Sequence, residues 1–177
     1  MPASTADQAT LPIVFVSQLG CGADIWKPVL DYMAGYDTVT YDRPGTGSAL
    51  PRPAPNPAIP HSVFAAELAG VLNQRQVNSP VVLVGHSFGG LIARVFAATW
   101  PGRIAGLVMV DSSIPPMHLT QDEDPKIDGD GPDATEIDAV RGHAEIIAGR
   151  LPNVPALVLT RTPGTWDGEN PPPHPRH

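Results

Sequence analysis

The chain of 177 residues is short enough to form one domain, and its 42% of apolar residues can build a core without disulfides or metal. With 16% charged residues and no apolar run near ~20 residues, the composition excludes a disordered chain and a membrane-spanning helix. The net charge of -7 argues against a nucleic-acid partner, and the single cysteine, Cys21, excludes an intramolecular disulfide.

We expect three parts along the chain: a flexible N-terminus (1–10), a core (11–165) and a Pro-rich tail (166–177). The first ten residues lack the charged start and apolar stretch of a signal peptide. Together with the single cysteine, this predicts a cytoplasmic protein.

Short apolar runs, rich in β-branched residues, predict strands that are covered on both faces. These runs occupy 13–16, 38–41, 81–84, 106–110 and 156–160. Helical periodicity predicts the intervening helices, which occupy 24–33, 62–76, 88–100 and 134–149. Ser62 is expected to cap its helix. In the last helix, the residues expected to face the sheet are Ile137, Val140, Ala144 and Ile147. This alternation predicts an α/β fold, a three-layer α/β/α sandwich with a mostly parallel sheet of about five strands.

The segment from Gln121 to Asp133 is acidic and irregular. Its sequence Asp128-Gly129-Asp130-Gly131 is similar to the start of a calcium loop, but the sixth position is Asp133 where that loop requires glycine. We therefore expect a solvated surface loop. The sequence contains neither a P-loop nor a GxGxxG motif, so nothing in it supports nucleotide binding.

The sequence Gly85-His86-Ser87-Phe88-Gly89 is a G-x-S-x-G motif between a predicted strand and a predicted buried helix. A sharp turn at this point presents the Ser87 hydroxyl clear of the backbone, as a nucleophile requires. Glycines on both sides remove side chains that would collide in such a turn. The Phe88 N–H then lies at the start of a helix, where it can stabilise a developing oxyanion. The alternative to a nucleophile is that Ser87 lies in a glycine-rich turn that only connects the strand to the helix.

The chain resembles the serine-nucleophile branch of the α/β-hydrolase superfamily over about residues 12 to 177. The resemblance rests on residues 85–97, on Gly106–Asp111 and on Tyr41–Ser48, which looks like the turn after one of that family's strands. It implies a shortened core that lacks the family's opening hairpin and its closing strand and helix. It also implies transfer of an acyl group to water through an acyl-enzyme. If the register is right, Leu19 donates the second oxyanion N–H, and Cys21 beside it is a small buried filler.

In this fold the catalytic triad, which consists of a nucleophile, an acid and a basic histidine, follows the chain order serine, acid, histidine. Asp111, at the end of a predicted strand, is one of two positions that the family uses for the acid; its alternative role is that of a turn residue. Asp167 and Glu169 are the other acid candidates. Only two histidines follow the last predicted strand, His174 and His177, and both lie in the Pro-rich tail. Since nothing there is expected to hold an imidazole, they are weak candidates for the base.

The function expected from this resemblance is hydrolysis of carboxylic esters or related acyl compounds by Ser87, impaired if the chain has no base. A non-catalytic protein that binds a small ligand, or an inactive fragment, is the alternative. We expect no metal and no organic cofactor. The expected partner is a small acyl substrate, with neither nucleic acid nor membrane. The last predicted strand is expected at the edge of the sheet, where its unpaired groups invite self-association.

Overall fold

The computed structural model describes residues 11–53, 57–114, 126–129 and 134–161. Its centre is a five-stranded sheet in the order β2-β1-β3-β4-β7, in which every neighbouring pair is parallel. The strands are β1 (Ile13–Val16), β2 (Thr38–Thr40), β3 (Val81–His86), β4 (Ile104–Val110) and β7 (Ala156–Leu159). Each overlaps one of the predicted runs. The α/β class and the parallel five-stranded sheet are therefore confirmed.

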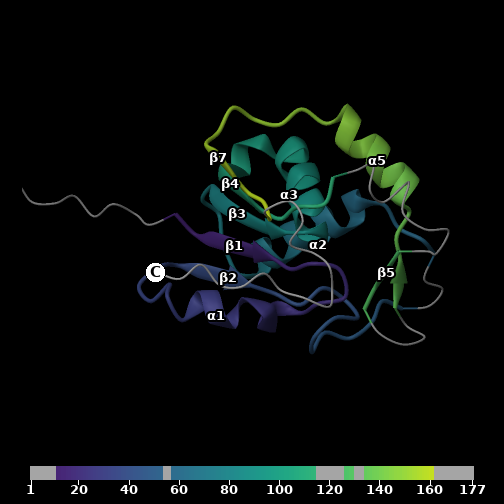
Figure 1. The fold of residues 1–177 in the computed structure, drawn as a ribbon, viewed down its shortest axis with the longest axis horizontal. Helices are drawn as coiled ribbons and strands as arrows, with labels where there is room; N and C mark the ends of the chain where they lie inside the picture. Colours follow the sequence, from purple (N-terminus) through teal and green to yellow (C-terminus); the bar gives the residue numbers. More distant parts are fainter. Residues whose placement is uncertain (1–10, 54–56, 115–125, 130–133, 162–177) are drawn as a thin grey trace, which may run out of the picture.

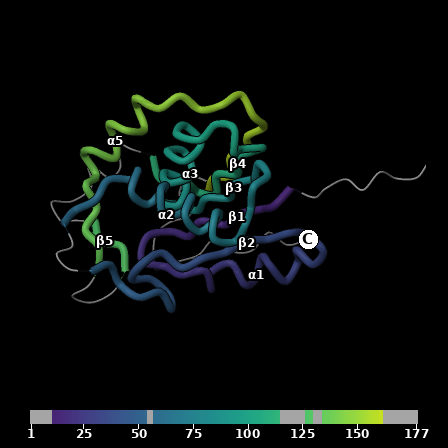
Figure 2. The backbone as a smooth tube through the Cα atoms, turned by 180° about the vertical axis from the view of Figure 1, so that it is seen from behind, coloured from purple at the N-terminus to yellow at the C-terminus, as the bar shows by residue number. Residues whose placement is uncertain are grey.

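Helices cover both faces of this sheet, as the three-layer prediction requires (Figure 1). One face carries α2 (His61–Gln74) and α3 (Phe88–Thr99), with α5 (Ala139–Ala148) packed against these two helices. The other face carries η1 (Ala23–Trp26) and the short α1 (Lys27–Leu30), which lie below the sheet in Figure 2 as well. A further turn, η2 (Pro101–Arg103), leads into β4.

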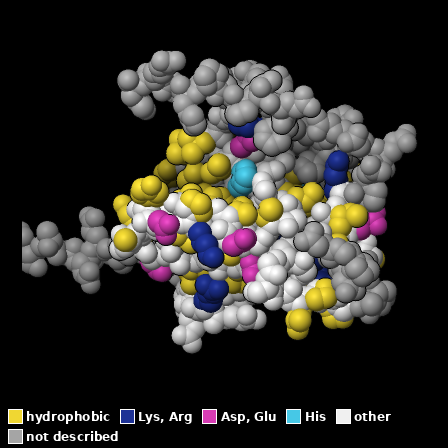
Figure 3. Space-filling model, turned by 60° about the horizontal axis from the view of Figure 1, so that its bottom comes forward, with side chains coloured by type: hydrophobic (Ala, Val, Ile, Leu, Met, Phe, Trp, Pro, Cys, Tyr) yellow, Lys and Arg dark blue, Asp and Glu magenta, His cyan; other side chains and the backbone are white. Residues whose placement is uncertain are grey.

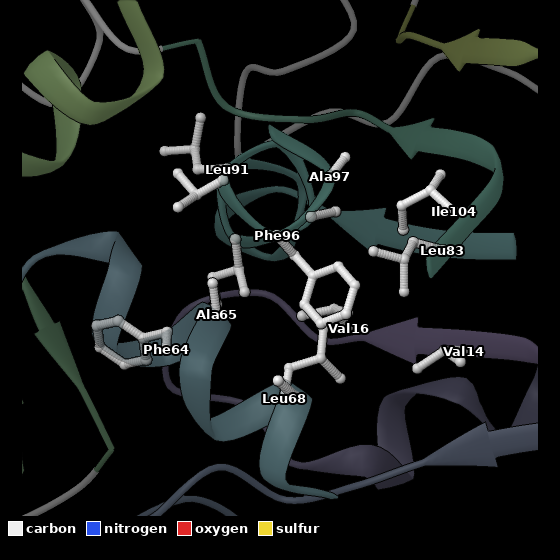
Figure 4. Packing of buried hydrophobic residues seen from close by; sticks show 14 of the residues in the cluster. Val14, Val16, Phe64, Ala65, Leu68, Leu83, Leu91, Phe96, Ala97 and Ile104 are labelled. Atoms are coloured by element: carbon white, nitrogen blue, oxygen red, sulfur yellow. The ribbon is translucent and has the colours of Figure 1, made fainter. Parts of the chain in front are cut away.

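The strands β1, β3 and β4 are apolar on both sides because both of their sides are covered. In β1, Val14 and Val16 belong to the main core, whereas Phe15 packs with Trp26 and Val84 on the opposite face. In the main core, the Phe96 ring points from α3 toward Leu68 of α2 and Val16 of β1 (Figure 4). Successive strand residues thus support both helical layers.

Both core helices bury the residues that the sequence pattern predicts. Phe64, Leu68 and Leu72 of α2 recur at intervals of four residues and are fully buried. The helix α3 is buried around most of its circumference, including Leu91 and Phe96. This explains why α3, which follows the G-x-S-x-G motif directly, is apolar almost throughout.

Two predictions about the helices were wrong. Ser62 is not an N-cap: that position is Pro60, and the Ser62 N–H and Oγ donate instead to the Glu145 carboxylate at 2.9 and 2.6 Å. Val140 and Ile147 are 72% and 70% exposed. The reason is that α5 packs on α2 and α3 through Gly142 and Ile146, which turns its other apolar positions toward solvent.

A small hairpin precedes α5. Its strands, β5 (Ile127–Asp128) and β6 (Thr135–Glu136), pair antiparallel and stand apart from the main sheet. The prediction of a solvated loop was wrong at Asp128, whose side chain is fully buried. A buried partner, described below, makes this burial possible.

The strand β7 lies at the edge of the sheet and pairs with β4 alone among the described strands. All of its residues are exposed, including Leu157 and Val158, so the prediction that this strand is covered on both faces was wrong. Figure 3 views the molecule from below Figure 1 and shows a group of hydrophobic side chains at the upper left of this face and others toward the right. Across the described ranges, no helix has the length and apolar character needed to cross a membrane.

Candidate active site

Ser87 lies at the sharp turn between β3 and α3, with φ of 50° and ψ of -117°. This conformation is rare for a residue with a side chain and persists only where the surroundings enforce it. Here the Ser87 N–H donates to the Val110 carbonyl at 3.1 Å, and the Ser87 carbonyl accepts from the N–H groups of Gly90 and Ser113 at 3.0 and 3.1 Å. The serine that the sequence pattern singles out therefore sits on a strained, firmly held turn.

The glycines around Ser87 are required by close backbone packing. A Cβ on Gly85 would lie 2.7 Å from the Gly89 carbonyl oxygen. A Cβ on Gly89 would lie 2.2 Å from the carbonyl oxygen of Val16. The turn thus packs directly on the end of β1, and on the backbone that continues from it.

The Ser87 hydroxyl is within hydrogen-bond distance of another hydroxyl, since its Oγ lies 3.2 Å from Oγ of Ser113. Ser113 follows β4, and its backbone N–H also binds the Ser87 carbonyl. The chain after β4 therefore runs alongside the turn that carries Ser87. Sequence reasoning did not single out Ser113, and no motif marks it.

The two predicted oxyanion donors come from two different parts of the chain. Phe88 is the first residue of α3, and its ring is buried against the rings of His61 and Phe64 at centroid distances of 5.4 and 5.2 Å. Leu19 lies in the loop after β1 and packs against the main core. In the same loop, the N–H of Gly20 donates to Asp128, and Gln18 Nε2 lies 3.1 Å from Cys21 Sγ.

The stretch Tyr41–Ser48 forms a tight turn organised by Asp42. The Asp42 carboxylate accepts the N–H of Ala23 at 2.6 Å and both the N–H and the hydroxyl of Ser48 at 2.9 Å. Burial acts to raise the pKa of Asp42, but these hydrogen bonds prevail and lower it. Asp42 thus ties the turn after β2 to the start of η1.

Asp111 directly follows β4, as predicted, and has a φ of 41°. Its N–H donates to the Leu159 carbonyl at 2.7 Å, and its Oδ2 pairs with Arg161 Nε at 2.6 Å. The side chain of Asp111 is therefore engaged with the chain that follows β7. The alternative acids, Asp167 and Glu169, lie outside the described residues.

His86 directly precedes Ser87 but packs edge-on against Trp26, with ring centroids 6.2 Å apart. Burial lowers the pKa of His86, and Arg161 acts in the same direction while Asp111 opposes it. Among the residues with a described position, no imidazole makes a hydrogen bond with Ser87. His118, His174 and His177 lie outside them.

Arg43 and Asp128 form an ion pair that sequence reasoning missed. Their side chains are 1% and 0% exposed, and two nitrogens of Arg43 meet the two oxygens of Asp128 at 2.7 Å. A buried arginine requires a carboxylate partner. However, no local pattern indicates which of the chain's acidic residues supplies it. Within the described ranges, no group of three or more potential ligands could hold a metal ion.

With this geometry in place, comparison with known proteins identifies the family. The sequence profile of the α/β-hydrolase fold matches residues 12–139, so the chain belongs to that family.

Individual relatives include several enzymes. The chain is 32% identical over 120 residues to a non-heme chloroperoxidase of Streptomyces lividans, a match that covers 65% of this chain and 41% of that protein. It is 26% identical over 161 residues to a (lyso)-N-acylphosphatidylethanolamine lipase of Mus musculus, and this match covers 88% of this chain and 42% of that protein. The solved structure of a thermophilic esterase from Thermogutta terrifontis superposes with a TM-score of 0.53 at 25% identity. This match covers 62% of this chain and 41% of that protein. The chain thus spans less than half the length of these relatives.

Proposed function

We propose that this chain carries the nucleophile of a hydrolase that cleaves carboxylic esters or related acyl compounds. In this proposal the Ser87 hydroxyl attacks the substrate carbonyl, and the N–H groups of Leu19 and Phe88 stabilise the oxyanion. Asp111 orients the general base. In the chain order of this fold, His174 and His177 are the candidates for that base. The base takes the proton of Ser87 and gives it to the alcohol, which leaves as the bond from the carbonyl carbon to the ester oxygen breaks. Water then hydrolyses the acyl-enzyme and releases the carboxylic acid, and no cofactor takes part.

The observation that carries the proposal is the conformation of Ser87. A serine with a φ of 50° between β3 and α3, enclosed by glycines that have no room for a side chain, is the turn that ester hydrolysis needs. The relatives support the same chemistry, because they include a lipase and an esterase. A turn that only connected two elements would not require this strain.

A fluorophosphonate probe tests the proposal, since it adds covalently to an activated serine. We expect intact-mass analysis to show one adduct on the wild-type chain, mapped to Ser87, and none on Ser87→Ala. Ser79→Ala, an exposed serine just before β3, is the matched control and is expected to react like wild type. Hydrolysis of p-nitrophenyl butyrate should follow the same pattern. A folded wild-type chain that neither reacts with the probe nor cleaves the ester would contradict the proposal.

The alternative function is binding of a small ligand without catalysis. Two contacts favour it: Ser87 Oγ lies against Ser113 Oγ, and the Asp111 carboxylate pairs with Arg161. A chain with this function would stay unlabelled while its melting temperature rises with an acyl ligand. The probe experiment therefore separates the two functions.

A further inference from the structure

The buried pair of Arg43 and Asp128 joins three segments that are distant in sequence. Arg43 comes from the turn after β2, Asp128 from the β5–β6 hairpin, and both contact the loop after β1. Burying a charged pair is unfavourable unless further hydrogen bonds satisfy it, and such pairs are often replaceable by apolar residues without loss of stability. Stability alone therefore does not explain why this charged pair is buried here.

The remaining hydrogen bonds of the pair all go to the backbone of the loop. Arg43 Nη1 donates to the Ser17 carbonyl at 2.8 Å, and Nη2 donates to the Gln18 carbonyl at 2.6 Å. Asp128 Oδ1 accepts the Gly20 N–H at 2.8 Å. The pair thus fixes both peptide groups that flank Leu19, one through its carbonyl and one through its N–H.

This arrangement determines where the Leu19 N–H points. In a planar trans peptide the N–H lies opposite the carbonyl, so the bond from Arg43 to the Gln18 carbonyl directs the Leu19 N–H away from Arg43. The Leu19 N–H makes no hydrogen bond with any residue whose position is described. The Leu19 N–H is therefore held in one direction, and no described residue accepts a hydrogen bond from it.

The same pair also contacts the turn that carries the nucleophile. The guanidinium carbon of Arg43 lies 5.8 Å from the centroid of the Phe88 ring. The carbonyl of Ser17, which Arg43 binds, would lie 2.7 Å from a Cβ on Gly89. Arg43 therefore touches both the loop of Leu19 and the first turn of α3.

We propose that Arg43 and Asp128 are positioning residues, which hold the Leu19 N–H where the oxyanion forms. This inference rests on the proposed function. Its physical basis is that an oxyanion donor is effective only when its direction is set before the reaction. The bonds to the Ser17 and Gln18 carbonyls need a planar guanidinium with several donors, which lysine lacks.

The test compares Asp128→Asn with Glu67→Gln, which breaks the bidentate pair of Arg52 and Glu67. Arg52 also binds Thr135 of the β5–β6 hairpin, but among the described residues the pair makes no hydrogen bond to the Leu19 loop. For Asp128→Asn we expect kcat for p-nitrophenyl butyrate to fall about tenfold or more with KM nearly unchanged. Affinity for a trifluoromethyl ketone, which mimics the tetrahedral intermediate, should fall by the same factor. Glu67→Gln should leave both quantities close to wild type, even if it lowers the melting temperature.

A second variant and a second measurement guard against a folding defect. Arg43→Lys keeps the charge beside Asp128 but cannot bind both carbonyls, so we expect a similar loss of kcat in a chain whose circular dichroism is native. Deuterium exchange should be faster in residues 17–22 of both variants and unchanged in α3.

The outcomes are distinguishable. If wild type is active and Asp128→Asn keeps its kcat and ketone affinity, or loses no more than Glu67→Gln, the positioning role is overturned and the proposed function stands. If exchange in residues 17–22 does not change in either variant, the positioning role is overturned as well. If wild type neither reacts with the probe nor cleaves the ester, the proposed function is wrong, and the catalytic role of the pair is rejected with it.

Discussion

At the scale of single residues, two glycines of the same chain are expected to respond to alanine in opposite ways. A Cβ on Gly89 would lie 2.2 Å from a backbone oxygen, whereas a Cβ on Gly70 in α2 meets nothing within 4 Å. We expect Gly89→Ala to lower the free energy of unfolding by about 2–3 kcal/mol. Gly70→Ala should raise it by about 0.5–1 kcal/mol, because alanine favours the helix. Urea denaturation measures both, and equal effects would contradict the close packing at Ser87.

His61 predicts a pH dependence of stability at the same scale. It is 2% exposed, and neither ring nitrogen has a hydrogen-bond partner of normal geometry among the described residues. Burial lowers the pKa of His61, and the nearby His143 acts in the same direction. The Gly142 backbone and the charges of Glu145 and Asp138 act to raise this pKa, but burial prevails.

In the unfolded chain His61 binds a proton near pH ~6.5, whereas in the folded chain its lowered pKa keeps it neutral at that pH. The free energy of unfolding is therefore expected to fall as the pH drops below that value. Thermal melting between pH 8 and pH 5 measures this loss. His61→Gln should reduce the loss, and His143→Gln, which leaves His61 in place, should retain most of it. A profile for His61→Gln as steep as that of wild type would show that another group is responsible.

At the scale of the element, β7 has a strand partner on one side only among the described residues. It pairs with β4 on one side, and Val158 at its centre is 63% exposed. An apolar strand with a free edge is a template for pairing with a second chain. We therefore propose that the chain self-associates through β7.

Charge at this edge should oppose the association. We expect Val158→Lys to shift the sedimentation profile toward monomer at high protein concentration. Val140→Lys places the same charge at a site on α5 that is 72% exposed and is not on a strand edge, so it should leave the profile as it is. Equal effects of the two substitutions would indicate general repulsion rather than strand pairing.

At the scale of the whole molecule, the architecture was predictable because its signals are local. Each strand is a short apolar run bounded by turn residues, and the absence of polar alternation predicted the burial of β1, β3 and β4 on both faces. The face of α2 was predictable for the same reason, since Phe64, Leu68 and Leu72 repeat at helical spacing. The face of α5 was not, because α5 packs on other helices, and its orientation depends on where those helices lie.

The sequence by itself determined the candidate nucleophile. Gly85, Ser87 and Gly89 lie within five residues of one another, so the motif can be recognised from the local sequence alone. Only the tertiary structure decided what surrounds it: Ser113 at the hydroxyl, Arg161 at Asp111, and Asp128 paired with Arg43 from 85 residues away. The physical reason is that buried charges and hydroxyls are satisfied by whichever group the packing brings near, and a pairing between distant segments leaves no periodic trace in either of them.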